Sequence, residues 1–359
     1  MKKIDLYIIK KYFVTFFFSI ILLLALVIVI DISEKIDDFI QHDLNYLTII
    51  SEYYLHFIPY FANLFSPLFI FISVIFFTSR LAQNSEIIAI YNTGMSFNRL
   101  LRPFIISSVI LMTLSYTLAN FIIPESNKHR IDFENKYLNS KKRELRKNIH
   151  IQKNNSQYYY FEGYNNKRNI GYKFSLENIE DGILKKKIRA NYIQWNKNQK
   201  NWSIHNYEIR KFKDDKEIFY KGSKLDTILD ITPDDFTVQI NHSETMTLKE
   251  LNNSIKNKSN ISSGKVKYYK IEKHKRIAFP FAILILTIIA VTLSSKKERK
   301  GLGKNLGIGL LIAFSYILFF QFSSTLATNG NLEPWIAVWI PNLIYINLGF
   351  LLLIRRNKI

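Results

Sequence analysis

The feature that most constrains this chain is the alternation of long apolar runs with polar segments. Six runs come close to or exceed the roughly 20 apolar residues that a membrane-spanning helix needs. They cover residues 12–30, 55–78, 104–123, 277–293, 306–327 and 335–354. A long polar region separates the first three from the last three. No small-residue cleavage site follows the first run, so we expect it to be an uncleaved span. The pattern predicts an α-helical polytopic membrane protein with six transmembrane helices and one large insert.

Composition adds little about partners. The net charge of +20 would suggest nucleic acid in a soluble protein. Lys, Asn and Ile are abundant throughout, however, which is a bias that an AT-rich genome produces, so we expect no nucleic-acid partner. The chain has no cysteine. This absence excludes disulfides, thiolate metal sites and a cysteine nucleophile.

Basic residues in the short loops predict the orientation. One set of helix ends carries Lys2, Lys3, Lys10, Lys11, Arg80, Arg99, Arg102, Lys296, Lys297, Arg299, Lys300, Lys304, Arg355, Arg356 and Lys358. The opposite short loops carry only Lys35. Because short cytoplasmic loops collect Lys and Arg, we expect both termini and residues 85–103 to be cytoplasmic and the insert to be periplasmic. The insert itself is too long for its charge to influence this prediction.

The insert is predicted to be an all-β domain. Segments 157–164, 170–179, 183–195, 202–212 and 217–229 are rich in Tyr, Phe, Ile and Trp, and Asn- or Asp-rich turns separate them. Asp181-Gly182 is the clearest hairpin turn. Strands at near-regular spacing predict a sandwich or jelly roll. Thr247 and Glu250 form a capping-box pattern that begins a helical linker. The predicted domains are therefore 1–123, 124–246 (jelly-roll-like), 247–276 (linker) and 277–359.

One cytoplasmic stretch, residues 85–103, is neither apolar nor loop-like. Ile87, Ile88, Ile90 and Tyr91 follow helical spacing. Ser85 can cap the start of this helix, and Gly94 is placed where a helix ends in the left-handed conformation. A short amphipathic helix between two spans is a suitable docking site for a soluble partner that drives movement of the membrane helices. An ordinary connecting turn that is helical explains the spacing equally well.

The residues that chemistry would need are absent. No phosphate-binding Gly-x-x-x-x-Gly-Lys-Ser/Thr motif occurs, and neither does His-Glu-x-x-His or Gly-x-Ser-x-Gly. The histidines are scattered. We therefore expect no catalytic residue, no metal site and no cofactor in this chain, and we do not expect an enzyme.

Five segments resemble, in the same order, segments of one known family. They are Leu81-Ala82-Gln83 with Ser85-Glu86 and Gly94; residues 191–202; Ile231-Thr232-Pro233-Asp234-Asp235; Arg276-Ile277-Ala278-Phe279-Pro280; and Trp339-Ile340-Pro341-Asn342. The family is that of the LptF/LptG permeases of the lipopolysaccharide-export ABC transporter. The resemblance extends over nearly the whole chain.

The resemblance implies a permease that extracts lipopolysaccharide from the inner membrane. It implies a second permease of the same type, a cytoplasmic ABC ATPase that binds ATP and Mg, and periplasmic jelly-roll bridge proteins of the LptC/LptA type. It also implies that residues 85–94 form the coupling helix, and that Ser85, Glu86, Ile87, Ile90 and Gly94 contact the ATPase. An acidic first turn and an apolar face suit a helix that docks in a groove.

An anionic lipid head group needs cations near the outer leaflet. Lys35, Lys128, Arg130 and Arg276 have that position in the predicted topology and are the head-group candidates. Basic side chains that snorkel at the interface would have the same placement. The resemblance also has a departure here, because the family carries basic residues after the first span and this chain has Asp37, Asp38 and Asp43.

Two alternatives stay open. A permease of the same plan could move another amphiphilic lipid, and the acidic loop after the first span favours a head group that needs fewer cations. A membrane-anchored envelope assembly scaffold could instead use the insert to bind a protein. The amphipathic stretch at 85–94 and the prolines inside the spans argue against simple anchors.

Overall fold

A computed structural model of the chain describes residues 3–138, 146–153, 156–165, 168–180, 182–213, 216–233, 242–256, 263–296, 301–329 and 332–357. The chain divides into two compact units. The helical unit consists of Met1–Phe133, Glu244–Leu251 and Tyr269–Ile359, and the β unit consists of Glu134–Ser243 and Asn252–Tyr268. Each unit is described by itself.

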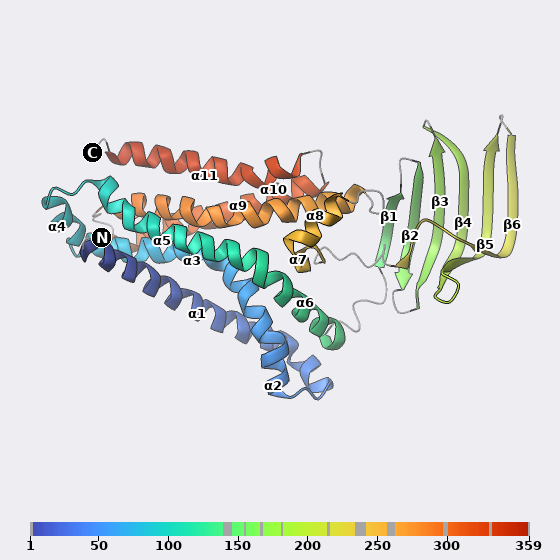
Figure 1. Cartoon of the computed structure of the whole chain (residues 1–359), viewed down its shortest axis with the longest axis horizontal. Coiled ribbons are helices and arrows are strands. Elements are labelled where there is room, and N and C mark those ends of the chain that lie inside the picture. Colours follow the sequence, from blue (N-terminus) through green and yellow to red (C-terminus); the bar gives the residue numbers. More distant parts are fainter. Residues whose placement is uncertain are drawn as a thin grey trace. The chain divides into compact units, whose positions relative to one another are not determined.

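Within the described residues, six helical segments are long and apolar enough to cross a membrane. They are Lys3–Gln41, Tyr46–Gln83, Phe97–Leu138, Val266–Ser294, Gly303–Thr328 and Pro334–Arg356. All six predicted spans fall within them, three before the β strands and three after them. The predicted plan of three helices, an insert and three helices is confirmed, and Figure 1 follows it along the chain.

The helices are longer than the apolar runs. The first helix, α1 (Lys3–Gln41), continues well past residue 30. It can do so because Asp31 and Lys35, one helical turn apart, pair at 2.5 Å. The third span was expected to begin at residue 104, but α5 (Phe97–Thr117) begins earlier because the Ser96 side chain accepts a hydrogen bond from the Arg99 amide at 3.4 Å.

The remaining helical elements extend or connect these spans. The second span contains α2 (Tyr46–Thr48), a π-helical turn η1 (Ile49–Tyr54) and α3 (Leu55–Gln83). After α5 come η2 (Leu118–Ile122), α6 (Ile123–Phe133) and η3 (Glu134–Leu138). The last three spans are α9 (Ser263–Ser294), α10 (Gly301–Asn329) and α11 (Pro334–Asn357). Pro59 and Pro67 lie inside α3, which is nonetheless continuous.

Polar bonds between helices accompany the apolar packing of the helical unit. Deep in the unit, the Tyr12 hydroxyl of α1 and the Thr287 hydroxyl of α9 lie 2.9 Å apart. Asn342 of α11 accepts a hydrogen bond from Tyr316 of α10 at 2.8 Å and donates one to the Ala278 carbonyl of α9 at 2.8 Å. Such bonds fix the register between helices, because inside a bilayer the alternative is an unsatisfied polar group.

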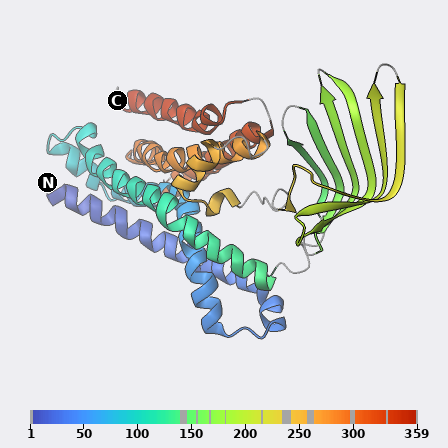
Figure 2. The ribbon, with the colours of Figure 1, turned by 45° about the vertical axis from the view of Figure 1, so that its right-hand side comes forward.

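The β unit contains one antiparallel sheet whose strands pair in sequence order (Figure 2). Its strands are β1 (Arg146–Lys153), β2 (Gln157–Asn165), β3 (Ile170–Glu180), β4 (Ile183–Asn196), β5 (Asn201–Lys213) and β6 (Lys216–Thr227). The inserted β domain is therefore confirmed. Glu180 pairs with Ile183 across the predicted Asp181-Gly182 turn, and Gly182 has φ +78°.

This order differs from the strand order of a jelly roll in one respect. Each described strand pairs with the next along the chain, whereas a jelly roll also joins distant strands. The connections explain the difference, because very short turns can only join adjacent antiparallel strands. The sequence also gave no prediction for β1, whose residues are mostly polar.

The two faces of the sheet differ in chemistry. One face carries a buried apolar cluster that includes Phe161, Phe174 and Ile204. Trp202 is fully buried in it and donates from its indole nitrogen to the Ile231 carbonyl at 2.7 Å. The chain leaving β6 is thus tied to the sheet at Ile231.

The helical linker follows the prediction in part. After α7 (His242–Thr245), α8 (Leu248–Lys256) begins with the expected capping box. The Thr247 amide donates to the Glu250 carboxylate at 2.8 Å, and the Glu250 amide donates to the Thr247 hydroxyl at 3.3 Å. Eight residues named in the sequence analysis, and parts of the Asn- and Asp-rich turns, lie outside the described residues; the eight are Lys2, Asp181, Asp234, Asp235, Lys297, Arg299, Lys300 and Lys358.

Candidate functional site

The stretch predicted to be an amphipathic helix forms α4 (Glu86–Asn92), between α3 and α5. Gly94 has φ +80° and ends it as predicted, with its amide donating to the Tyr91 carbonyl at 2.9 Å. The expected capping role of Ser85 was wrong. Its side chain makes no capping bond, because Ser85 itself adopts a left-handed conformation (φ +61°) where the chain turns sharply out of α3.

The two faces of α4 have distinct roles. Ile87 is only 2% exposed and belongs to the core of the helical unit, while Ile90 and Tyr91 pack against that core. The opposite face consists of Ile88, which is 43% exposed, together with Ala89, Asn92 and Thr93. Helical spacing predicted the amphipathic pattern but placed Ile87 and Ile88 together on one face, and only the family resemblance implied a partner contact for Ile87. The structure instead directs Ile88 outward.

Two side-chain contacts join the start of α1 to this region. The Tyr7 hydroxyl donates to Glu86 Oε2 at 2.9 Å. Arg99 donates two parallel hydrogen bonds to Asp5, from Nη1 to Oδ1 at 2.8 Å and from Nη2 to Oδ2 at 2.7 Å. The ends of α1 and α11 and the helix α4 lie together at one end of the helical unit (Figure 1). Asp5 and Tyr7 were not among the residues predicted from the sequence. A carboxylate at the start of an apolar run could have pointed to them, because such a carboxylate needs a cation or a hydrogen-bond donor beside it.

Lys35 lies in a compact cluster at the far end of α1. Its ammonium pairs with Asp31 at 2.5 Å and hydrogen-bonds the Tyr53 hydroxyl. The Tyr54 hydroxyl donates to the other oxygen of Asp31 at 3.0 Å. The Lys35 side chain is 23% exposed, so an incoming anion would have to compete with Asp31 for it.

Arg276 is buried, and its guanidinium is held by three protein oxygens. Nε donates to Glu272 at 2.9 Å, Nη1 to the Met246 carbonyl at 2.7 Å, and Nη2 to the Glu244 carbonyl at 3.4 Å. Arg276 thereby fastens the turn between α7 and α8 to α9.

A small cavity of about 70 Å³ lies beside Arg276. Its lining includes Tyr60, Asn127, Glu244 and Lys275. Asn127 is fully buried, and its amide nitrogen has no hydrogen-bond partner among the described residues. Burial and the nearby Glu272 carboxylate raise the pKa of Glu244, against the opposing effect of Lys275 and two arginines. The cavity therefore has charged side chains of both signs and an unused donor in its lining.

The other two head-group candidates differ in accessibility. Arg130 is buried, 5.1 Å from the centre of the Tyr60 ring, and its Nε donates to Asn127 Oδ1 at 3.4 Å. Lys128 is exposed and makes no ion pair with another described residue. The structure thus brings Arg130 and Arg276 together around Glu244. Lys35 belongs to the separate cluster with Asp31.

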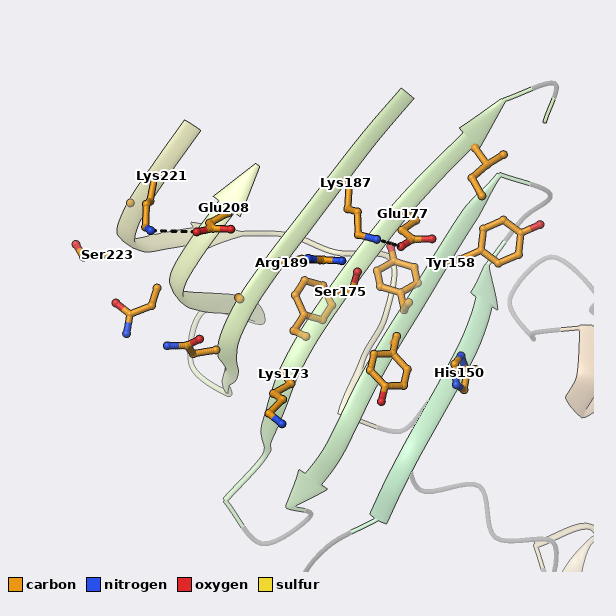
Figure 3. A pocket seen from close by; sticks show the side chains of 18 residues that line it. His150, Tyr158, Lys173, Ser175, Glu177, Lys187, Arg189, Glu208, Lys221 and Ser223 are labelled. Atoms are coloured by element: carbon orange, nitrogen blue, oxygen red, sulfur yellow. Dashed lines mark ion pairs between the residues drawn. The ribbon is translucent and has the colours of Figure 1, made fainter. Parts of the chain in front are cut away.

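The polar face of the sheet borders a concave space of about 1050 Å³ (Figure 3). Strand pairing aligns one row of side chains across all six strands: His150, Tyr160, Ser175, Arg189, Glu208 and Lys221. Lys187 pairs with Glu177 at 2.5 Å and Lys221 with Glu208 at 3.0 Å, as the dashed lines show. Ion pairs therefore hold two of the lysines that line this space.

The whole sequence was compared with known families. The family model described as "Lipopolysaccharide export system permease LptF/LptG" matches residues 6–355. The chain belongs to the LptF/LptG family. The match covers all six apolar helices and the inserted sheet, which confirms the family resemblance. No individual curated protein matches the sequence.

Membership of the LptF/LptG family assigns the chain to the permeases of lipopolysaccharide export. Together with the six apolar helices, it indicates a multi-pass protein of the bacterial inner membrane. An LptF/LptG permease is a transport component, so its functional sites are surfaces that bind lipid and protein. In this LptF/LptG chain the strongest structural candidates are α4 and the charged clusters around Lys35 and Arg276.

Proposed function

We propose that this LptF/LptG permease works in an ATP-driven transporter that extracts lipopolysaccharide from the inner membrane. In this proposal both termini and α4 are cytoplasmic, and the β unit is periplasmic. The basic residues of the short loops support this orientation, since they gather at the helix ends that include Arg80, Arg99 and Arg355.

The observation that carries the proposal is the exposed face of α4. The seven-residue helix packs Ile87, Ile90 and Tyr91 inward, yet it holds Ile88 outward between two spans. An apolar side chain on a short, rigidly held helix fits a groove on a soluble partner. We assign that partner as the cytoplasmic ATPase, which binds ATP and Mg and transmits their energy through α4.

A second permease of the same type would complete the membrane part. Large apolar side chains are exposed along α1, such as Phe18, and along α10, such as Leu311 and Leu318. Lipid covers part of such a surface in a membrane protein, and another helix bundle can cover the rest.

The head-group cations would act at the opposite end of the helices. Lys128 is accessible there, and the Asn127 amide provides a donor in the cavity beside Arg276. Arg130 and Arg276 would supply positive potential from a buried position. Two of the four candidates, Lys35 and Arg276, already pair with Asp31 and Glu272. This pairing favours, as a second candidate substrate, an amphiphilic lipid with fewer anionic groups.

The bridge hand-off would use the edges of the sheet. Among the described strands β1 pairs only with β2, and β6 pairs only with β5, so each has one edge without a partner. Open edges accept another strand through backbone hydrogen bonds. Bridge proteins of the LptC/LptA type could therefore extend the sheet and receive the lipid.

Co-purification tests the proposal. Tagged wild-type permease would be solubilised gently and compared with Glu86→Lys and Ile88→Glu, which change α4, and with Asn98→Lys, an exposed change in the first turn of α5. The proposal expects a soluble ATPase with the wild type and Asn98→Lys, but not with the α4 variants.

Recovery of envelope proteins without any ATPase, from folded protein, would contradict the proposal and support the assembly-scaffold alternative. Lipid analysis of the same preparations separates the two substrate candidates. Bound lipopolysaccharide supports the first candidate, whereas a less anionic lipid in its place supports the second.

A further inference from the structure

The first turns of α1 are attached to both ends of the segment that contains α4. Tyr7 hydrogen-bonds Glu86, the first residue of α4, and Asp5 pairs with Arg99 in the first turn of α5. We call these two contacts the clasp. The clasp joins residues that are 79 and 94 positions apart in the sequence. Any displacement of the α4 segment therefore acts directly on the start of α1.

The Asp5–Arg99 half of the clasp has a fixed geometry. Asp5 is 5% exposed, and both of its oxygens accept from Arg99 at 2.7–2.8 Å. A bidentate pair of this kind restricts both distance and orientation, unlike a single contact between point charges. The pair therefore forms a joint that carries a tilt of α5 to α1.

The contacts of α4 and α5 with the other helix ends are less directional. Arg356 of α11 lies over the rings of Tyr91 and Phe97, 5.9 Å and 5.6 Å from their centres, and contacts Ser295 at 3.4 Å. A guanidinium above an aromatic face can slide with little loss of attraction. The segment can thus shift against α11 while it stays joined to α1.

The rest of α1 is packed lightly within this chain. Only 11% of the residues in its most apolar window are buried, against 67% for α9. Apart from Phe39 near its far end, its buried apolar side chains form one stripe at four-residue spacing: Ile8, Tyr12, Phe16, Ile20 and Leu24. A helix held along a single stripe can pivot more easily than one buried on several sides.

We propose that Asp5 and Arg99 are positioning residues that make α1 follow the docking helix α4, with Tyr7 and Glu86 as the second attachment. This inference rests on the proposed function, because it assumes that a partner displaces α4. It assigns α1 as the span that responds to docking. Neither residue needs to touch the partner or the lipid for this role.

The absence of cysteine simplifies the test, because labels on this chain attach only where a cysteine is introduced. Spin labels would be attached at Ile21→Cys in α1 and at Leu343→Cys in α11. The native side chains at these positions are 63% and 55% exposed, respectively. The distance between them would be measured in the assembled transporter, with and without a non-hydrolysable ATP analogue. Backgrounds would be the wild type, Arg99→Ala, the charge swap Asp5→Arg with Arg99→Asp, and the control Arg102→Ala.

We expect the analogue to shift the distance in the wild type and in Arg102→Ala. In Arg99→Ala the ATPase should still co-purify, but the shift should disappear and ATP-dependent lipid release should fall about tenfold, a typical size for coupling between sites. The charge swap should restore part of the distance shift and part of the ATP-dependent lipid release. Arg99→Lys, which keeps the charge but loses the bidentate geometry, serves if Arg99→Ala does not fold.

Three results would overturn the inference: no shift in the wild type, a full shift in Arg99→Ala, or loss of ATPase binding in Arg99→Ala. The last would make Arg99 part of the docking surface. If the wild-type permease binds no ATPase, the proposed function itself is wrong. Co-purification with the wild type therefore separates a failure of the proposed function from a failure of this inference.

Discussion

Neighbouring isoleucines in α4 should respond to the same truncation in opposite ways. Ile87 is 2% exposed within the core, and Ile88 is 43% exposed on the outward face. Ile87→Ala removes buried carbons worth about 0.8 kcal/mol each in transfer from water. The cavity left behind adds to this loss, so we expect Ile87→Ala to destabilise the helical unit by about 2–4 kcal/mol.

Ile88→Ala should leave stability within about 0.5 kcal/mol of the wild type, because the side chain is largely outside the core. If Ile88 fills a groove on the ATPase, its truncation should weaken docking by about 1.4 kcal/mol, which is roughly tenfold in Kd. Thermal unfolding of the detergent-solubilised permease measures the first quantity. Titration of immobilised permease with the ATPase measures the second.

An exchange of effects between the two variants would contradict the roles assigned to Ile87 and Ile88. A stable Ile87→Ala with weakened docking would mean that Ile87 leaves the core to bind the partner. An Ile88→Ala that docks like the wild type would mean that the apolar outward face of α4 is not part of the interface.

Three further predictions concern single side chains. Trp202→Phe removes the bond to the Ile231 carbonyl and should destabilise the β unit by about 1–3 kcal/mol, measured by chemical unfolding with Trp202→Tyr as a comparison; unchanged stability would show that water replaces the indole. Gly94→Ala adds a Cβ at a residue with φ +80°, and no atom lies within 4 Å of that Cβ. The substitution should therefore cost only about 1 kcal/mol of backbone strain. A much larger loss of thermal stability would indicate a steric role for Gly94. Glu244, whose pKa burial raises, binds its proton more tightly in the folded state, so its contribution to stability should fall as pH rises from the unfolded pKa through the folded one. Glu244→Gln should therefore gain stability relative to the wild type as pH rises over that window, and pH-independent differences in melting temperature would contradict this.

Apolar run length and charge placement were sufficient to predict the six helices and the insert. The exact helix ends depended on local contacts that composition does not show. Ser96, for example, caps α5 well before the apolar run begins, and Asp31 pairs with Lys35 to extend α1 past its own run. In the insert, the predicted strands agree closely with β2 to β6 because Tyr- and Ile-rich segments alternate with strong turn formers.

The candidate site was less predictable, because its contacts join residues far apart in the chain. Periodicity identified α4 as amphipathic, but it could not say which of Ile87 and Ile88 meets the core, since that depends on how α3 ends. In the same way, Lys35 and Arg276 looked like free cations in the sequence. Asp31, Glu272 and the Met246 carbonyl engage them in the fold.

The central claim is that a partner ATPase drives lipid movement through α4. The most direct measurement is ATP-dependent release of lipopolysaccharide from proteoliposomes that contain wild-type or Ile88→Glu permease, supplied with the same ATPase and other transporter components. The account predicts release with the wild type and none with Ile88→Glu, although the variant is folded and the ATPase is active. Equal release from both would contradict it.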